Sequence, residues 1–300
     1  MLPRIMKKER TGQLLLVTFS FYLLLASTTV AGTRLEQERD SVMGHLKGPV
    51  RSIQLKRELV SEVNGQQTTK PTPCCVNTFT YNPEGYKLEE LRHTSTGELS
   101  SKTVITYDAE KRSRESLNYA GTGPADLRNV TTYNARGQAS EKIFYSPPET
   151  FQTKHIYTYD SKGRRTEEAS YNAKGALLRK IIMTYDAKGN QIEWTNYKGD
   201  GSLHAKILYN YNDQGHMIKK VSLGRNGALD LTMIYAYDVK GNKTSETTID
   251  PELGTLKQDF TYEFDAAGNW VKQTTCTWVT KFGKTYCEPS GIAYRTITYY

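Results

Sequence analysis

Histidine and cysteine, on which much enzyme and metal-site chemistry depends, are scarce in this sequence. The chain of 300 residues has four Cys and five His. The histidines, at positions 45, 93, 155, 204 and 216, do not have the spacing of metal ligands. No GxSxG, HExxH, CxxC or dinucleotide-binding motif occurs, and Gly283-Lys284-Thr285 lacks the upstream glycine of a phosphate-binding loop because Trp278 stands in its place. The sequence therefore predicts no catalytic residues, no metal site and no cofactor, and we expect that the protein is not an enzyme.

A strong excess of charge of one sign is also lacking. The formal net charge is +8, and the first 32 residues contribute +3 of it through Arg4, Lys7, Lys8 and Arg10 against Glu9. In the remainder, Lys and Arg are interleaved with Glu. A nucleic-acid-binding surface requires basic residues clustered on one face. We therefore expect no nucleic-acid partner.

A long apolar run is present at one place, close to the N-terminus. The four basic residues just named precede the apolar stretch 14–30, and small residues offer a cleavage site at 29–32. This order predicts a signal peptide over residues 1–32, and export to the periplasm, the cell surface or the medium. An uncleaved membrane anchor is the alternative, and the protein would then contact the membrane through this segment alone.

The four cysteines of an exported protein can be oxidised. Cys276 and Cys287 stand on either side of a Phe282-Gly283 turn, so they could face each other across a hairpin. Cys74 and Cys75 could form a vicinal disulfide, or each could pair with one of the C-terminal cysteines. Four cysteines allow three connectivities, and the sequence leaves all three open.

What the chain has in abundance is tyrosine at a fixed interval. A motif of the form Tyr-Asp-x-x-Gly, as in Tyr185-Asp186-Ala187-Lys188-Gly189, returns every 26 residues, with a last step of 27. Its first residues, here called the anchor positions, are Tyr81, Tyr107, Tyr133, Tyr159, Tyr185, Tyr211, Tyr237 and Phe264. The Asp or Asn can accept a hydrogen bond from the N–H two residues on, and the Gly supplies a positive φ, so each motif predicts a type I turn with a bulge. Weaker turn signals lie halfway between, and one unit therefore consists of strand, turn, strand and turn.

Columns of similar residues appear when each unit is numbered from its anchor position as zero. Position −2 and the anchor Tyr share one apolar, Tyr-rich face of the predicted sheet. On the other face, position +8 is Glu and position +21 is Lys or Arg in five successive units. If +12 pairs with +17 at the mid-unit turn, these two columns oppose each other, and we expect a ladder of ion pairs across the sheet. The columns are Glu89, Glu115, Glu141, Glu167 and Glu193, and Lys102, Arg128, Lys154, Lys180 and Lys206.

The predicted fold class is all-β, an antiparallel meander of tandem 26-residue, two-strand repeats over residues 76–270. Residues 33–75, within which 50–55 alternate like an edge strand, are expected to form N-terminal cap strands and a loop. Residues 271–300 are expected to form a C-terminal cap hairpin and strand. So many strands exceed what an open flat sheet accommodates, so we expect a curled or spiralling sheet, with a closed barrel as the alternative.

Two columns supply candidate binding residues. Tyrosines at +12 could stack on sugar rings, or they could fill the packing of the sheet; they are Tyr119, Tyr145, Tyr171 and Tyr197. Basic residues at the third position of the anchor turns would form a row along one edge of the sheet. They could contact an anionic polymer, or they could be solvated turn residues; they are Arg136, Lys162, Lys188 and Lys240.

The tandem segments Tyr159-Asp160-Ser161-Lys162-Gly163-Arg164 and Tyr185-Asp186-Ala187-Lys188-Gly189-Asn190 resemble the YD-repeat, or RHS-repeat, family, and the resemblance extends over about residues 76–270. It implies an exported or cell-surface bacterial protein whose repeats form a spiralling β-sheet. In large members that sheet is a shell around a toxin domain, and carbohydrate binding has been ascribed to some. The unit of this chain is longer than the usual repeat of the family, and the array is short.

These features together predict an exported, non-catalytic β-repeat protein that acts as a binding or structural module of the cell envelope. A cell-wall or surface polysaccharide, or an envelope protein, is the expected partner. The alternative is a protein-interaction component of an exported toxin or adhesion system that uses an exposed sheet edge.

Overall fold

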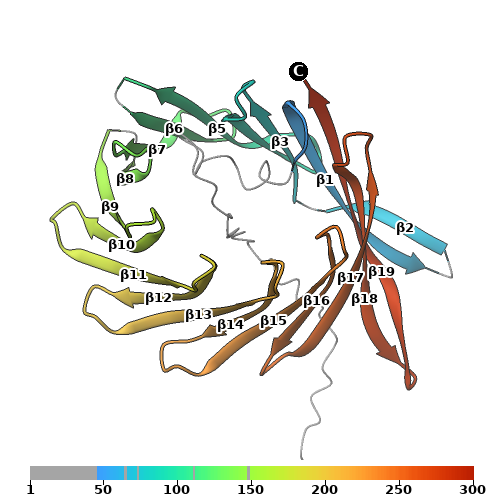
Figure 1. Cartoon of the computed structure of the whole chain (residues 1–300). Coiled ribbons are helices and arrows are strands. Elements are labelled where there is room, and N and C mark those ends of the chain that lie inside the picture. The colour runs from blue at the N-terminus through green and yellow to red at the C-terminus, as the bar shows by residue number, and fades with distance from the viewer. Residues whose placement is uncertain (1–45, 64–65, 73, 111, 147–148) are drawn as a thin grey trace, which may run out of the picture.

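The computed structural model describes residues 46–63, 66–72, 74–110, 112–146 and 149–300. The signal peptide expected over residues 1–32 lies outside this part of the chain. Within it, every regular element is a β-strand; there are nineteen, and all except β2 are arranged around a ring (Figure 1). None of the described residues belongs to a helix with the length and hydropathy needed to span a membrane.

The strands are β1 (Val50–Val63), β2 (Gln66–Pro71), β3 (Cys74–Tyr81), β4 (Lys87–Thr94), β5 (Leu99–Asp108), β6 (Ser113–Ala120), β7 (Ala125–Tyr133), β8 (Ala139–Tyr145), β9 (Phe151–Tyr159), β10 (Arg165–Asn172), β11 (Leu177–Tyr185), β12 (Gln191–Lys198), β13 (Leu203–Tyr211), β14 (Met217–Leu223), β15 (Leu229–Tyr237), β16 (Lys243–Asp250), β17 (Gly254–Phe264), β18 (Trp270–Lys281) and β19 (Lys284–Tyr299).

The anchor turns close the hairpins in the way that the motif predicts. In the turn after Tyr185, the N–H of Gly189 donates to the carbonyl of Asp186 at 3.1 Å, and Gly189 has a φ of +94°. In the preceding anchor turn, the carboxylate of Asp160 accepts hydrogen bonds from the backbone N–H of Lys162 at 3.0 Å and of Arg164 at 2.9 Å. The recurrent Asp and Asn therefore cap their own turns.

The sheet closes through β1. Strands β3 to β19 pair in sequence, each antiparallel to the next, and residues 50–59 of β1 pair with β19 while residues 52–55 also pair with β3. The far part of β1, residues 58–63, pairs with β2. Eighteen strands therefore form a closed barrel, and β2 is an additional strand beside β1. The all-β antiparallel meander is confirmed, and the closed barrel is the form that it takes. The prediction of an edge strand over residues 50–55 is wrong, because both sides of this segment are paired.

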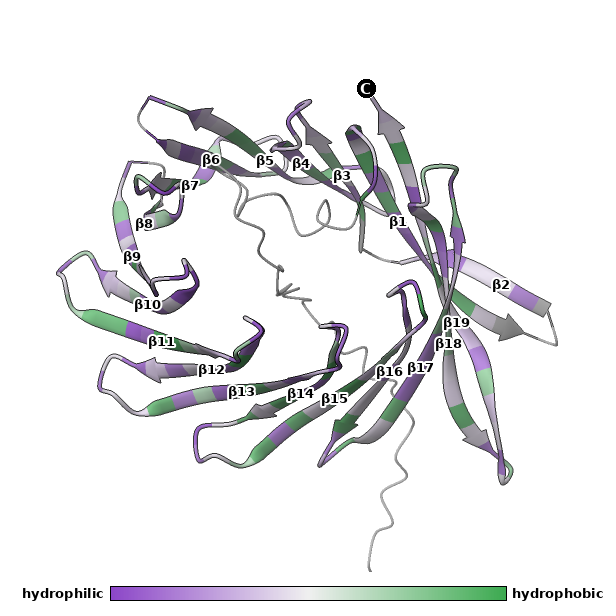
Figure 2. Cartoon of the chain, viewed as in Figure 1, coloured by the Kyte–Doolittle hydropathy of each residue, from purple (hydrophilic) through white to green (hydrophobic). Residues whose placement is uncertain are grey.

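The two walls of the barrel differ in burial. The wall that carries the anchor Tyr holds most of the buried residues of the repeats, among them Ile105, Tyr133, Met183 and Tyr209. The opposite wall carries exposed apolar residues at position −3, such as Ile182. Closing a sheet brings the side chains of its inner wall together and spreads those of its outer wall apart. We therefore assign the anchor-Tyr wall as the inner wall. Figure 2 shows polar and apolar residues interspersed along the strands.

The two ends of the barrel also differ. At the end formed by the anchor turns, neighbouring turns touch: the side-chain amide of Gln138 donates to the carbonyl of Gly163 in the next anchor turn at 2.9 Å. A Cβ added to Gly163 would lie 2.8 Å from the same amide. At the other end the contacts vary: a Cβ added to Gly175, Gly201 or Gly227 in the mid-unit turns would meet no atom within 4 Å, whereas one added to Gly199 would lie 2.0 Å from the carbonyl oxygen of Leu177. Figure 1 shows the anchor turns between β11 and β18 toward the middle of the ring and the mid-unit turns at its periphery, so the anchor turns form a narrow rim and the mid-unit turns a wide one.

The most completely buried side chains lie where the barrel closes. Val50 and Ile53 of β1 pack with Phe79 and Tyr81 of β3, and Ile53 and Tyr81 are 0% exposed. Ile297 of β19 packs against the same cluster. Closure is therefore held by hydrophobic burial as well as by backbone hydrogen bonds.

Candidate functional site

The outer wall carries the predicted ladder of ion pairs. Each +8 Glu is paired with the basic residue at position +21 of the same unit: the distances are 3.0 Å for Glu89–Lys102, 2.9 Å for Glu115–Arg128, 3.6 Å for Glu141–Lys154, 2.8 Å for Glu167–Lys180 and 2.9 Å for Glu193–Lys206. All of these side chains are partly exposed. Each pair is therefore worth about 0.2–1 kcal/mol, and the ladder contributes more to register than to stability.

The register that produces this ladder differs from the predicted one. At the turn between β12 and β13, Tyr197 at +12 faces Leu203 at +18, and a bulge shifts the pairing between Asn196 and Tyr197. Glu193 consequently faces Leu208 and reaches Lys206 diagonally. The predicted pairing of +12 with +17 is wrong because an extra residue follows each mid-unit turn from the β4–β5 turn to the β14–β15 turn.

The +12 tyrosines lie on the same outer wall, next to the wide rim, and are partly exposed. Each faces a basic residue of the preceding strand and, in three of the four cases, a large apolar residue of the following strand: Arg128 and Phe151 for Tyr145, Lys154 and Leu177 for Tyr171, and Lys180 and Leu203 for Tyr197. Tyr119 faces Lys102 and Ala125. The guanidinium of Arg128 lies 5.0 Å from the ring centroid of Tyr145. The structure therefore places the four tyrosines in one row, on alternate strands.

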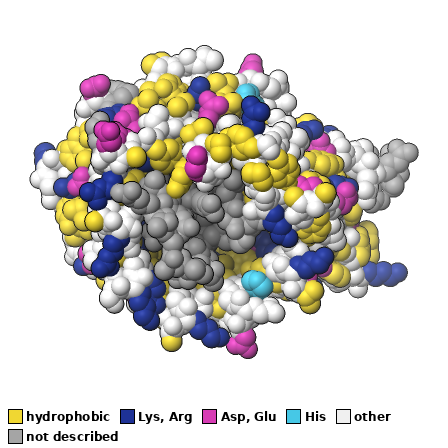
Figure 3. Space-filling view, turned by 45° about the horizontal axis from the view of Figure 1, so that its top comes forward, with side chains coloured by type: hydrophobic (Ala, Val, Ile, Leu, Met, Phe, Trp, Pro, Cys, Tyr) yellow, Lys and Arg dark blue, Asp and Glu magenta, His cyan; other side chains and the backbone are white. Residues whose placement is uncertain are grey.

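The predicted basic row lies on the narrow rim. Arg136, Lys162, Lys188 and Lys240 are exposed, and their backbone N–H groups belong to the anchor turns. The ammonium of Lys188 is 3.5 Å from the carboxylate of Asp213 in the next turn. Figure 3 shows Lys and Arg side chains interspersed with Asp and Glu over the face that it presents. The rim is thus mixed in charge where its cations meet acidic turn residues.

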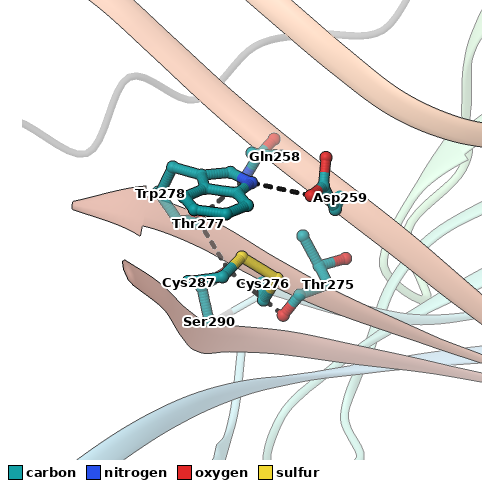
Figure 4. The surroundings of a disulfide bond; sticks show 8 residues. All are labelled: Gln258, Asp259, Thr275, Cys276, Thr277, Trp278, Cys287 and Ser290. Atoms are coloured by element: carbon teal, nitrogen blue, oxygen red, sulfur yellow. Dashed lines mark hydrogen bonds between the residues drawn. A yellow bond between two sulfur atoms is a disulfide. The ribbon is translucent and has the colours of Figure 1, made fainter. Parts of the chain in front are cut away.

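The C-terminal hairpin contains a disulfide bond. Cys276 of β18 and Cys287 of β19 are joined, with Cα atoms 5.5 Å apart, as one of the three sequence connectivities allows (Figure 4). The side chains of Cys74 and Cys75 lie outside the described part of the structure. Asp259 lies beside the disulfide and accepts a hydrogen bond from the indole N–H of Trp278 at 2.7 Å. Because the two sulfur atoms are bonded to each other, this group does not offer thiolate ligands to a metal.

The inner wall carries three copies of one cluster, which the sequence analysis did not predict. In each copy a Glu at +9 pairs with a cation at +6, and that cation lies over the aromatic ring at −2 of the same unit. The copies are Glu90 with Lys87 and Phe79, Glu168 with Arg165 and Tyr157, and Glu246 with Lys243 and Tyr235. They recur every 78 residues, and their glutamates lie on β4, β10 and β16. These strands are six apart around a ring of eighteen, so the clusters divide the inner wall into thirds.

The middle cluster is the most extensive. The carboxylate of Glu168 is 2.9 Å from Nδ1 of His155, 3.2 Å from the guanidinium of Arg179 and 3.4 Å from that of Arg165. Burial alone would raise the pKa of Glu168, but the hydrogen bond from His155 and the charges of Arg165, His155 and Arg179 outweigh it and lower the pKa. Glu168 is therefore an ionised acceptor held by several donors.

The tyrosines of the inner wall are neutral hydrogen-bonding groups. Burial raises the pKa of Tyr209 and of Tyr211 to about 12. The hydroxyl of Tyr211 donates to the carbonyl of Gln191 at 2.9 Å, and that of Tyr185 donates to the carbonyl of Arg165 at 2.6 Å. Each of these anchor tyrosines thus ties its own strand to the preceding one. The inner wall offers fixed charges and aromatic faces for binding, on a rigid support.

A family model described as "Uncharacterised protein" matches residues 132–268, and no curated protein matches the chain. A porin-like protein from Bacteroides uniformis is 16% identical, with a TM-score of 0.43, over 84% of this chain and 98% of that one. A protein of unknown function from Bacteroides fragilis is 14% identical over 36% of this chain and 91% of that one, with a TM-score of 0.31. The Tc holotoxin pore of Photorhabdus luminescens is 13% identical over 76% of this chain and only 16% of that one, with a TM-score of 0.32.

Proposed function

We propose that the protein is an exported, non-catalytic binding module of the cell envelope, and that its ligand is an extended glycan. The observation that carries this proposal is the row of tyrosines on the outer wall. Strands lie 4.7–4.9 Å apart, so side chains on alternate strands are about 10 Å apart, roughly the length of a disaccharide. Tyr145, Tyr171 and Tyr197 thereby offer aromatic faces at a sugar-like repeat, each beside a basic side chain.

The other properties of the site support binding over catalysis. The inner-wall carboxylates form ion pairs, as Glu90 does with Lys87 and Glu246 with Lys243, and a paired carboxylate is a poor proton donor near neutral pH. The proposal includes export, which rests on the N-terminal segment 1–32. It also includes membership of the YD-repeat proteins, which rests on the Tyr-Asp-x-x-Gly turns.

Removing the rings of the tyrosine row tests the proposal. The triple variant Tyr145→Ala, Tyr171→Ala, Tyr197→Ala is expected to lose at least tenfold in affinity for an envelope polysaccharide that the wild type retains, because stacking depends on the rings. Retention on immobilised polysaccharide at low salt measures it. The control is the triple Tyr→Phe variant, which keeps the rings and should keep most of the binding. If the alanine variant folds and binds as tightly as the wild type, the row is not the glycan site.

The second candidate function, a protein-interaction component of an exported toxin or adhesion system, is favoured by the β18–β19 hairpin. Among the described residues, no strand pairs with the hairpin on the β17 side beyond Thr277 or on the β1 side before Gly291. It extends beyond the ring (Figure 1), and Phe282 at its tip is 103% exposed. A free sheet edge with an exposed aromatic residue suits addition of a strand from a partner.

The backbone at Phe282 gives this second candidate a test. Phe282 has a φ of +52°, which is unfavourable for a bulky residue. Phe282→Asn is therefore expected to raise the stability by roughly 0.5–1 kcal/mol, because Asn tolerates the left-handed conformation. Denaturant unfolding measures the change. An interaction function requires in addition that this folded variant lose a defined envelope partner that Tyr197→Ala retains; equal retention by both would remove the hairpin tip as the contact.

A further inference from the structure

Two arginines lie on the inner wall where the barrel closes. In the register of β1 and β19, Leu55 faces Arg295 and Arg57 faces Ala293. Arg57 and Arg295 are thus diagonal neighbours on one wall, a separation that long side chains span. They share this wall with Ile53 and Phe79 of the buried cluster at the seam.

No described residue supplies a counter-charge to this pair. Neither guanidinium makes an ion pair or a hydrogen bond within the described part of the chain. Glu58, the nearest carboxylate in sequence, alternates onto the outer wall and is 2.7 Å from Lys56. On β18, Lys272 is paired with Glu263 at 2.7 Å. The two positive charges are therefore held together without compensation from these strands.

Arg57 is exposed and Arg295 is partly buried, and of the two Arg295 is the one that a neighbouring side chain fixes in place. Burial lowers the pKa of Arg57, and burial together with the nearby charge of Arg57 lowers that of Arg295 to about 10. The guanidinium of Arg295 lies 3.6 Å from the ring centroid of Trp270 on β18, which holds it in place by a cation–π contact. Two neighbouring arginines, one of them held against an aromatic ring and neither paired with a described carboxylate, form a candidate site for an anion.

Neutral hydrogen-bonding groups surround the arginines. On β3, Asn77 faces Leu55, and its buried Oδ1 has no hydrogen-bond partner among the described residues. On the other side, Gln273 faces Ala293 and donates to the hydroxyl of Tyr262 at 2.9 Å. A ligand that presents an oxyanion to the arginines and a hydroxyl group to Asn77 would satisfy both.

We propose that Arg57 and Arg295 form an anion-binding site on the inner wall, which takes a phosphate, sulfate or carboxylate group. Guanidinium groups bind such oxyanions with two parallel hydrogen bonds each. The site is independent of the tyrosine row, since it lies on the other wall and at the seam.

The first test is ligand-induced stabilisation. The full-length protein is heated with sodium phosphate, sodium sulfate or sodium galacturonate, each at an ionic strength matched with NaCl. A bound anion raises the Tm in a saturable way, since a ligand of the folded state stabilises it. We expect this rise for the wild type and for Arg225→Gln, an exposed control in a mid-unit turn, and its loss in Arg57→Gln. The three anions distinguish a phosphate or sulfate site from a carboxylate site.

Two further readouts guard against a folding artefact. In the absence of anion, Arg57→Gln should have a higher Tm than the wild type, because an uncompensated charge beside Arg295 has been removed. Anion binding should also change the fluorescence of Trp270, which Arg295 covers, and should not do so in Arg57→Gln. The proposal is overturned if no anion raises the Tm of the wild type, or if Arg57→Gln shows the same rise and the same fluorescence change.

Discussion

Replacing Glu168 by glutamine is expected to lower the free energy of unfolding by about 3–5 kcal/mol, the usual cost of removing one partner from a buried ion pair. The side chain of Glu168 is 15% exposed and holds His155, Arg165 and Arg179 together. Without its charge, the two guanidiniums repel each other on the inner wall. Urea unfolding, followed by far-UV circular dichroism, measures the loss.

Glu167 provides the matched control, since it is the same residue type one position earlier in β10. It lies on the outer wall, where its 2.8 Å pair with Lys180 is about one-third exposed. Glu167→Gln should therefore cost only about 0.2–1 kcal/mol. Equal losses for the two variants would contradict the assignment of the inner and outer walls.

The pH dependence of stability follows from the same group. The pKa of Glu168 is lower in the folded protein than in the unfolded chain, where that of Glu is about 4.3. Its contribution is thus fully present above about pH 4.3 and is lost as the pH falls through the folded-state pKa. As the pH falls, the free energy of unfolding of the wild type should decrease more steeply than that of Glu168→Gln. The two free energies should therefore converge at low pH. A constant difference down to acid pH would show that Glu168 does not act through its charge.

The local features of this barrel could be predicted because they repeat. The Asp or Asn after each anchor Tyr defines a turn by its own chemistry, and alternation between turns defines two faces. That was sufficient for the meander, for the Glu–Lys/Arg ladder and for the hairpin that carries Cys276 and Cys287. Each of these depends on residues close in sequence or one unit apart.

Features that depend on distant pairing could not be predicted in the same way. Residues 50–55 alternate like any strand, and nothing in them shows whether one or both sides are paired; their partners in β19 lie more than 230 residues away. The clusters of Glu90, Glu168 and Glu246 were present as a pattern in the +9 column. Their period of three units, however, corresponds to equal spacing around the barrel only because eighteen strands close into a ring.

The ion pairs of the ladder were predicted correctly, but from a strand register that is wrong. The bulges explain how both can be true. A bulge shifts pairing by one residue at the mid-unit turns of the five units that carry the ladder. The Glu and Lys side chains are long enough to meet diagonally as well as directly. The same shift brings Tyr145 against Phe151, with ring centroids 6.3 Å apart. Contacts between columns of long side chains can therefore be predicted correctly even when the predicted backbone register is wrong.

Weakening the closure of the barrel should also lower the free energy of unfolding by a large amount. Ile53→Ala removes a side chain that is 0% exposed from the cluster of Val50, Phe79 and Tyr81 at the seam. Large-to-small substitutions at such positions cost about 2–5 kcal/mol, through lost burial and the cavity left behind. Ile182→Ala is the control, because Ile182 lies on the outer wall and is 36% exposed, so its truncation should cost about 1 kcal/mol or less.

The strands in which hydrogen exchange accelerates show whether Ile53→Ala weakens the closure of the barrel or the whole fold. In a closed barrel each strand has two neighbours, and opening the seam frees β1 from β3 and β19 while the repeats remain paired with one another. Hydrogen exchange in Ile53→Ala should therefore accelerate most for backbone amides of β1, β3 and β19, and least for those of β10 to β13. Uniform acceleration around the ring would mean that the barrel unfolds as a single unit, and that the seam is no weaker than the junctions between repeats.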